Sequence, residues 1–251
     1  LVGSEMCIRD SIADFYKEKD CDVETNVGPN GVKVTIDSGK SGKTIAIRAD
    51  FDALPIEEQT GLSFASKNKG VMHACGHDAH TAYMLILGET LIEMKEQFKG
   101  KVVIIHQPAE EMPPGGAQGM IKDGVLDGVD HVLGAHVMST MEAGKVFYKE
   151  GYVQTGRAYF KLVVQGKGGH GSSPHMANDA IVAGSNFVTT AQTVVSRRLN
   201  PFETGVVTIG SFDGKGQFNV IKDQIEIEGD VRALTDPVSY THLTLPTTPY
   251  V

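Results

Sequence analysis

The feature that most constrains this chain is the stretch His73–His80, which reads HACGHDAH and stands directly before a long run of apolar residues at helical spacing. It holds three histidines, a cysteine and an aspartate, and thiolate, imidazole and carboxylate are the groups that bind transition metals. Because alternate residues of a loop can point towards one centre, Cys75 and His77 are able to share an ion. Two other interpretations stay open: a polar turn that begins a helix, and a reactive Cys75 thiol with His77 or His80 as its base.

Composition excludes several classes of protein. The chain has 251 residues, which is enough for one large or two medium domains with a proper core. Its formal charge of -8 argues against a nucleic acid or an anionic membrane as partner. No apolar run approaches the roughly 20 residues that a membrane helix needs. Three scattered cysteines do not make a disulfide framework, so we expect a cytoplasmic protein.

Both ends of the sequence differ in character from the rest. Residues 1–10 (LVGSEMCIRD) show no hydrophobic period and no initial methionine, and residues 239–251 (SYTHLTLPTTPYV) match neither strand nor helix. Both resemble translated sequencing-adapter ends, so we expect them to be non-native and give no functional weight to Cys7 or His242. The native protein is then expected to continue beyond both ends.

The first module, residues 12–152, has the pattern of an α/β fold. Alternating β-branched segments at residues 32–36 and 44–48 predict two paired strands joined by a glycine-rich turn. The apolar run 102–105 predicts a buried parallel strand, and residues 131–137 predict another. Residues 12–19 indicate the end of a helix. A helix over residues 78–97 has a core-facing stripe of residues spaced by three or four, namely Met84, Leu87, Leu91, Met94 and Phe98. We therefore expect an open, mostly parallel sheet.

The second module, residues 157–237, follows a boundary expected near residues 151–156. Residues 158–165, 205–212 and 218–234 alternate as half-buried strands, and residues 177–199 form a second long amphipathic helix. Between the first strand and this helix lies a glycine-rich loop, residues 166–175, that holds His170 and His175. This order predicts an antiparallel sheet with one face covered by a helix, a separate α+β module.

Chemically active side chains follow the strands of the first module. In an open α/β sheet the carboxyl ends of the strands lie along one edge, so these groups can converge on one cleft. In chain order they are Asp50 and Asp52, Cys75 and His77, Glu110 and Glu111, and His136. Such a set can hold one zinc-like ion fully or two ions partly, and two ions about 3.5–4 Å apart would clamp a water molecule and a carbonyl oxygen. One of the adjacent glutamates could then be a ligand and the other a general base, which predicts a hydrolase.

Five motifs, in order, resemble those of one family. The family is that of metal-dependent amidohydrolases that include hippurate hydrolase, N-acyl-L-amino-acid amidohydrolases and plant auxin-conjugate hydrolases, which are relatives of the aminoacylase and glutamate-carboxypeptidase metallopeptidases. The resemblance covers about residues 12–237, and the motifs are residues 48–57, 72–80, 106–111, 134–137 and 168–175.

The resemblance implies a dinuclear site for Zn, Mn, Ni or Co. By motif, its ligands would be Cys75, His77, Glu111 and His136. Glu110 would be the base that deprotonates the attacking water, and Asp52 would be a carboxylate that orients a ligand. The implied reaction is hydrolysis of the amide bond of an N-acyl-L-amino acid, or of a short peptide, to a carboxylic acid and a free amino acid.

The resemblance also implies that the second module is an inserted lid and dimer interface. His170 would reach the neighbouring subunit's site and stabilise the oxyanion, while Asn219 and Arg232 would hold the substrate carboxylate. The family's remaining metal ligand is a histidine that follows the lid, and His242 is not expected to replace it. We therefore expect the native enzyme to be active and the 251-residue chain alone to be inactive and poorly stable. A non-catalytic relative that serves in binding or oligomerisation is the alternative.

Overall fold

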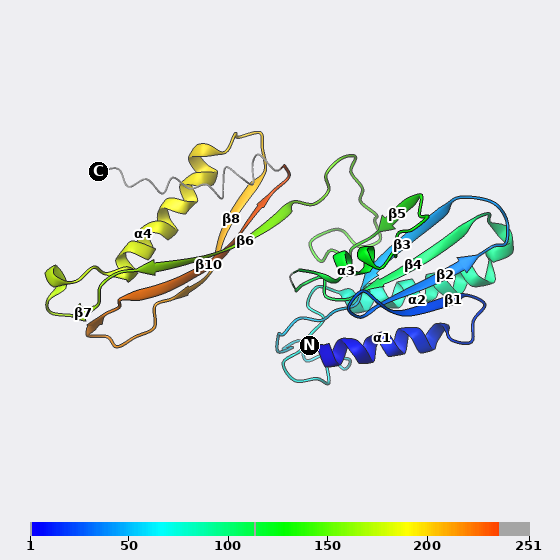
Figure 1. Cartoon of the computed structure of the whole chain (residues 1–251), viewed down its shortest axis with the longest axis horizontal. Helices are drawn as coiled ribbons and strands as arrows, with labels where there is room; N and C mark the ends of the chain where they lie inside the picture. Colours follow the sequence, from blue (N-terminus) through cyan, green and yellow to red (C-terminus); the bar gives the residue numbers. More distant parts are fainter. Residues whose placement is uncertain (1, 113, 236–251) are drawn as a thin grey trace. The chain divides into compact units, whose positions relative to one another are not determined.

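The computed structural model describes residues 2–112 and 114–235. The chain divides into two units, Leu1–Ala143 and Gly144–Val251 (Figure 1). We expected the boundary near residues 151–156; residues 145–155 contain no helix or strand. The division at residue 143 therefore assigns this irregular segment to the second unit.

The first unit is built on a five-stranded sheet in the order β1-β2-β4-β3-β5. The β1–β2 and β2–β4 pairings are antiparallel, whereas β4–β3 and β3–β5 are parallel. The strands are β1 (Asp22–Val27), β2 (Gly31–Asp37), β3 (Thr44–Asp50), β4 (Lys101–Gln107) and β5 (His131–Gly134). The α/β class is thus confirmed, and the sheet is mixed.

The predicted pairing of residues 32–36 with residues 44–48 is wrong, because β4 lies between β2 and β3. The connection from β2 to β3 passes around the start of β4, where the N–H of Gly100 donates to the carbonyl of Lys40 at 2.8 Å. Of the five strands, β4 has the longest unbroken apolar run, residues 102–105, and a central position buries such a strand on both faces and both edges. The burial of β4 therefore outweighs the proximity of β2 and β3 in the sequence.

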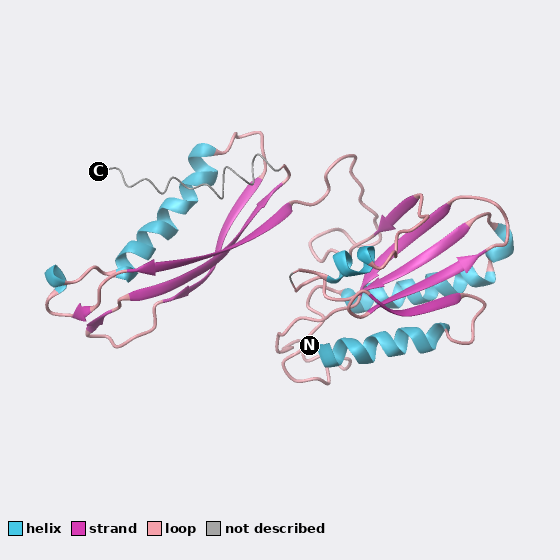
Figure 2. Cartoon of the chain, viewed as in Figure 1, coloured by secondary structure: helices cyan, strands magenta, loops and turns pink. Residues whose placement is uncertain are grey.

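Helices cover both faces of this sheet (Figure 2). On one face α1 (Val2–Tyr16) and α2 (His77–Glu93) pack with the side chains of Val102 and Ile104. On the other face Val103 and Ile105 pack beside α3 (Gly116–Lys122) and the turn after it. Alternate residues of β4 thus enter two separate cores, as the period of a strand requires.

Helix α1 includes most of residues 1–10, the segment that we expected to be non-native. Its residues Ile8, Ile12 and Tyr16 pack against the core that β2 and α2 share. Helical spacing brings these three side chains to one face, and residues 1–10 alone do not show this period because two of the three lie beyond residue 10. The non-native origin of these residues stays a prediction, and residues 236–251, with His242, lie outside the described residues.

The predicted helix over residues 78–97 is present as α2 followed by a short 3₁₀ turn, Lys95–Gln97. Met84 is fully buried, and Leu87, Leu91 and Phe98 pack against the core. Met94 is 40% exposed, so its place in the stripe is wrong. The reason is that α2 ends at Glu93 and the backbone leaves the helical spacing there.

The second unit is a three-stranded antiparallel sheet in the order β6-β10-β8, with α4 packed on one face. Its elements are β6 (Gly156–Gln165), α4 (Ala180–Thr193), the π-helical turn Val194–Arg198, β8 (Gly205–Asp213) and β10 (Gln224–Ala233). The Asp179 side chain caps α4 by accepting from the N–H groups of Ile181 and Val182. The α+β character of this module is confirmed.

Short elements complete the glycine-rich loop of the second unit. The two-residue strand β7 (Gly169–His170) pairs with β9 (Val220–Ile221), and a 3₁₀ turn covers Pro174–Met176. Within residues 2–112 and 114–235, no helix has the length and hydrophobicity needed to cross a membrane.

We predict that Gly100→Ala destabilises the first unit much more than Gly39→Ala. Both glycines have a positive φ, but a Cβ at Gly100 would lie 2.0 Å from the carbonyl oxygen of Lys43, whereas one at Gly39 meets nothing within 4 Å. The backbone conformation alone costs about 1 kcal/mol, and the added clash should raise the loss at Gly100 to about 3 kcal/mol. Urea unfolding of the two variants measures this, and equal losses would contradict it.

A second prediction concerns His106, which is fully buried on β4 and has no hydrogen-bond partner for either ring nitrogen among the described residues. Burial lowers its pKa from 6.5 to about 3, so the unfolded state binds more protons in that range. The free energy of unfolding should therefore fall as the pH is lowered through this window, by up to about 1.4 kcal/mol per pH unit from this residue.

His106→Leu should make this dependence shallower. Urea unfolding at several pH values, with a chelator present throughout, checks the slope. His131→Gln, which replaces an exposed histidine of the same unit, is the control. A slope that is unchanged in His106→Leu would show that acid destabilises the unit through other groups.

Candidate metal centre

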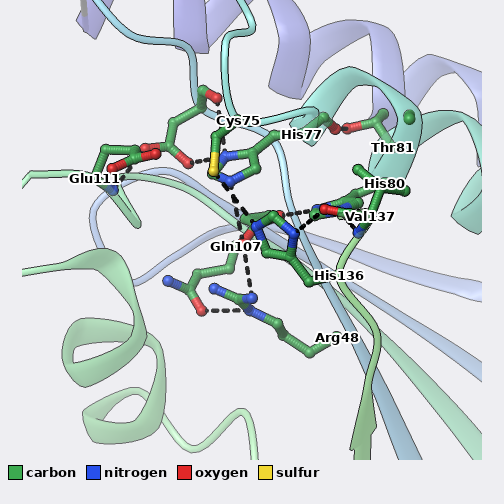
Figure 3. A network of polar contacts seen from close by, with 12 residues as sticks. Arg48, Cys75, His77, His80, Thr81, Gln107, Glu111, His136 and Val137 are labelled. Carbon is green, nitrogen blue, oxygen red and sulfur yellow. Dashed lines mark hydrogen bonds and ion pairs between the residues drawn. The ribbon is translucent and has the colours of Figure 1, made fainter. Parts of the chain in front are cut away.

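Segments from four places in the first unit bring their side chains together (Figure 3). Cys75 stands in the turn before α2, His77 is the first residue of α2, Glu110 and Glu111 follow β4, and His136 follows β5. Ligand atoms of Cys75, His77 and His136 lie within 4.8 Å of one another, as do those of His77, Glu110 and Glu111. The structure thus places the five predicted residues around one centre.

A left-handed glycine makes the Cys75–His77 turn. Gly76 has a φ of 85°, and a Cβ on it would lie 2.5 Å from a methyl carbon of Val137. Glycine adopts this conformation without the steric penalty of other residues. The turn allows Cys75 and His77 to face the same centre, and it allows the backbone that follows β5 to approach closely.

Asp52 orients both His77 and Glu111. One of its carboxylate oxygens lies 3.1 Å from Nδ1 of His77, and the other accepts the backbone N–H of Glu111 at 2.9 Å. Burial acts to raise the pKa of Asp52, but the hydrogen bonds from His77 and from the N–H groups of Glu111 and Glu110 lower it overall. The carboxylate therefore stays ionised and fixes both groups.

The imidazole of His77 is prepared to bind a cation. Burial acts to lower its pKa, but the hydrogen bond to Asp52 and the charges of Asp50, Asp52 and Glu110 raise it. With Nδ1 donating to Asp52, Nε2 is the atom left to take up a proton or a metal ion; it has no hydrogen-bond partner among the described residues and lies 3.7 Å from a carboxylate oxygen of Asp50. The carboxylates that favour a proton on this buried nitrogen would also favour a metal cation, which is the arrangement expected of a metal ligand.

His136 lies two residues beyond β5, which ends at Gly134 rather than near residue 137 as we predicted. The early end of the strand frees the backbone to bend towards α2. Nδ1 of His136 lies 2.6 Å from the carbonyl oxygen of Val137, and Nε2 lies 3.4 Å from the sulfur of Cys75. The Nε2 atom is therefore the one directed to the centre.

The environment of Cys75 disfavours the free thiolate. Burial raises the pKa of its thiol to about 11, and the carboxylates of Glu111, Glu110 and Asp50 add to the effect. A nucleophilic cysteine needs the opposite surroundings. One thiol, two imidazoles and several carboxylates instead fit divalent ions of the Zn, Mn, Ni or Co group, whose positive charge would offset the crowded acids.

Sequence reasoning missed a second buried network beside the centre. Nδ1 of His80 lies 2.5 Å from Asp50, and its Nε2 accepts the backbone N–H of Val137 at 2.9 Å. Asp50 in turn forms an ion pair with Arg48 at 2.7 Å. All three residues belong to motifs that the sequence displays, but only the fold shows that they touch. Because both nitrogens of His80 are occupied, His80 is not a base for Cys75.

The predicted site residues of the second unit lie at two ends of its sheet. His170 is adjacent to Asn219, since the N–H of Gly171 donates to the Asn219 carbonyl at 2.8 Å. Arg232 lies near the other end of β10, about 26 Å along the strand from Gln224, and pairs with Asp230 at 2.9 Å. Within one chain, the structure does not bring Asn219 and Arg232 together.

An α/β sheet that gathers thiol, imidazole and carboxylate groups beyond its strand ends is the arrangement of a metal-dependent hydrolase. The comparison with known families agrees. The model of peptidase family M20/M25/M40 matches residues 46–233, and the chain belongs to this family.

Individual relatives support the same conclusion. The chain is 43% identical to an N-acetyl-L-cysteine deacetylase of Bacillus subtilis over 227 residues, which are 90% of the chain and 54% of the relative. A solved structure from methicillin resistant Staphylococcus aureus is 80% identical, with a TM-score of 0.83 over 94% of this chain and 63% of that one. The Bacillus subtilis YXEP protein, a dinuclear metal binding peptidase, is 34% identical, with a TM-score of 0.72 over 94% and 60% of the two chains.

Other relatives, at 39% to 42% identity, carry the names N-acyl-L-amino acid amidohydrolase, IAA-amino acid hydrolase and hippurate hydrolase. The resemblance that the five motifs suggest is thereby confirmed. The chain spans only 45% to 63% of the length of the relatives named here.

We predict that Asp52→Asn weakens metal binding by about 10- to 100-fold, because the amide no longer fixes His77 and Glu111 with a charged acceptor. Asp78→Asn is the matched control, since the exposed Asp78 carboxylate accepts a hydrogen bond from the adjacent Ala79. Competition with a coloured chelator gives the dissociation constants for zinc. Equal affinities in the two variants would remove the orienting role from Asp52.

Proposed function

We propose that the whole protein is a dinuclear-metal amidohydrolase that cleaves N-acyl-L-amino acids to a carboxylic acid and a free amino acid. The observation that carries this proposal is the convergence of Cys75, His77, Glu110, Glu111 and His136 on one centre. The names of the relatives support the substrate class, which includes N-acetyl and hippurate-like conjugates and short peptides.

Cys75, His77, Glu111 and His136 would hold two divalent ions of the Zn, Mn, Ni or Co group. Bound there, such ions polarise a carbonyl group and lower the pKa of a water molecule. Asp52 keeps the His77 ring in the tautomer that presents Nε2, and its bond to the N–H of Glu111 fixes the segment that carries both glutamates. The chain thus supplies ligands that are already oriented.

Glu110 is the general base in this proposal. Its side chain is exposed next to the centre, whereas the neighbouring Glu111 is partly buried and has its backbone fixed by Asp52. An exposed carboxylate at this place can accept a proton from water and return it to the leaving amine. The two adjacent glutamates therefore have different roles, one as base and one as ligand.

We propose that the second unit acts as a lid and forms a homodimer. His170 would stabilise the oxyanion in the neighbouring subunit's site, and the adjacent Asn219 would contact the same substrate. Because Arg232 lies at the other end of β10, it and Asn219 would reach one substrate carboxylate only from different subunits. This arrangement accounts for both residues without requiring one lid to span the distance.

We predict that Glu110→Gln lowers kcat for an N-acyl amino acid by about 10²- to 10⁴-fold while metal binding persists, because the amide cannot take up a proton. Glu111→Gln should instead weaken metal binding. Assays of N-acetyl and N-benzoyl amino acids, with metal content measured in parallel, separate these effects. Hydrolysis by Glu110→Gln at the unaltered rate would remove the base assignment.

Removal of metal tests the reaction class. Dialysis against a chelator should abolish hydrolysis, and added Zn²⁺ or Mn²⁺ should restore it. Activity that survives the chelator but is lost in Cys75→Ser would instead identify a thiol hydrolase. A protein that binds metal and N-acyl amino acids without turnover would be the non-catalytic relative.

A further inference from the structure

Helix α2 holds the backbone on both sides of His136. The N–H of Val137 donates to Nε2 of His80 at 2.9 Å, and the hydroxyl of Tyr83 donates to the carbonyl of Ala135 at 3.0 Å. His77, His80 and Tyr83 are spaced by three residues, so they share one face of the helix. The face that presents His77 to the centre therefore also holds the segment of a second ligand.

His80 takes part through hydrogen bonds on both ring nitrogens. Its Nδ1 lies 2.5 Å from Asp50, and both side chains are almost completely buried. Because Nε2 must accept a hydrogen bond from the N–H of Val137, Nδ1 carries the proton and donates a hydrogen bond to Asp50. Asp50, His77 and His80 lie close enough together to suggest a metal site. A neutral His80 ring with both nitrogens engaged, however, has no lone pair left to bind an ion. His80 therefore supports the centre without being a ligand.

Arg48 extends the network away from the centre. Its guanidinium pairs with Asp50 at 2.7 Å, and its Nε donates to the side-chain oxygen of Gln107 at 2.8 Å. Gln107 is the last residue of β4, directly before the loop with Glu110 and Glu111. The contacts thus run from the end of β4 through Arg48, Asp50 and His80 to Val137. Figure 3 labels Gln107, Arg48, His80 and Val137 along this path.

His136 needs such support because the sheet does not provide it. β5 ends at Gly134, and residues 135–138 are exposed and belong to no helix or strand. The ring of His80 lies edge-on to the ring of His136, with centroids 4.5 Å apart. What fixes His136 in the first unit is therefore α2, through a side-chain contact and two hydrogen bonds to the flanking peptide groups.

We propose that His80 is a positioning residue, which together with Tyr83 sets the place of His136 at the metal centre. It binds neither ion nor substrate. It acts by accepting the N–H of Val137, and Asp50, paired with Arg48, keeps the His80 ring in the tautomer that can accept it. This inference rests on the proposed metal centre. The usual effect of removing such a partner of a ligand is a loss of about 10- to 100-fold in metal affinity.

Four variants of the whole protein test this. His80→Phe keeps the aromatic contact with His136 and removes both hydrogen bonds. His80→Gln restores one donor and one acceptor, which can bridge Asp50 and Val137. Tyr83→Phe removes only the hydroxyl that holds Ala135. Thr90→Ala, at an exposed position further along α2, is the control.

The readout is binding of Co²⁺, followed through the absorption bands of the ion and of its bond to the Cys75 thiolate, with dissociation constants from chelator competition. We expect His80→Phe to bind Co²⁺ about 10- to 100-fold more weakly and with an altered spectrum. His80→Gln should recover most of the affinity, and Tyr83→Phe should lose about 2- to 10-fold. Thr90→Ala should match the parent protein.

The inference is overturned if His80→Phe binds Co²⁺ with the parent's affinity and spectrum and loses only thermal stability. If His80→Phe does not fold, Tyr83→Phe decides, because His80→Gln is expected to bind Co²⁺ nearly as well as the parent protein. Tyr83→Phe with the affinity of Thr90→Ala would then overturn the inference equally. Failure of the parent protein to bind Co²⁺ would be a different result, because it would refute the metal centre itself.

Discussion

Two carboxylates buried at the end of β3 organise the first unit. Asp50 and Asp52 are 1% and 2% exposed, and a charge removed from water in this way must be compensated by ion pairs or hydrogen bonds. Arg48 and His80 compensate the charge of Asp50, and His77 and the backbone N–H of Glu111 compensate that of Asp52. The partners other than Arg48 come from α2 and from the loop after β4, so compensating the two charges also assembles the site.

Helix α2 connects this requirement to the hydrophobic core. Met84 on α2 is buried against β2, β3 and β4, which fixes the axis of the helix over the sheet. With that axis fixed, His77 and His80 at its first turn reach the carboxylates of β3, and Tyr83 reaches the strand end beyond β5. The packing of apolar side chains therefore determines where the polar ones meet.

The second unit follows a different logic, because the face of its sheet opposite α4 carries ion pairs. Lys161 on β6 pairs with Glu226 on β10, and Asp230 on β10 pairs with Arg157 on β6 and with Arg232 on β10 itself. Exposed pairs of this kind contribute little to stability. The unit depends instead on α4, which buries Ala180 against Ile225 and Ile227. The loop with His170 and the strand after Asn219 are joined through β7 and β9, at one end of this sheet.

The sequence by itself determined the types of element and the chemistry of the site. Period-two alternation identified the antiparallel module, the apolar run of β4 identified a buried strand, and the stretch from His73 to His80 together with the two glutamates predicted a metal centre. These signals are local, since each depends on residues close together in the chain. The sequence motifs also pointed to the family before the fold was considered.

Only the tertiary structure decided which elements are neighbours and which polar groups pair. Strand order depends on which strand gains most from burial on all sides, so β4 separates β2 from β3 although a short turn joins them. The role of His80 could not be read from its motif, because its partners Asp50 and Val137 are 30 and 57 residues away. The separation of Asn219 from Arg232 likewise follows from the straight course of β10, which a motif match does not reveal.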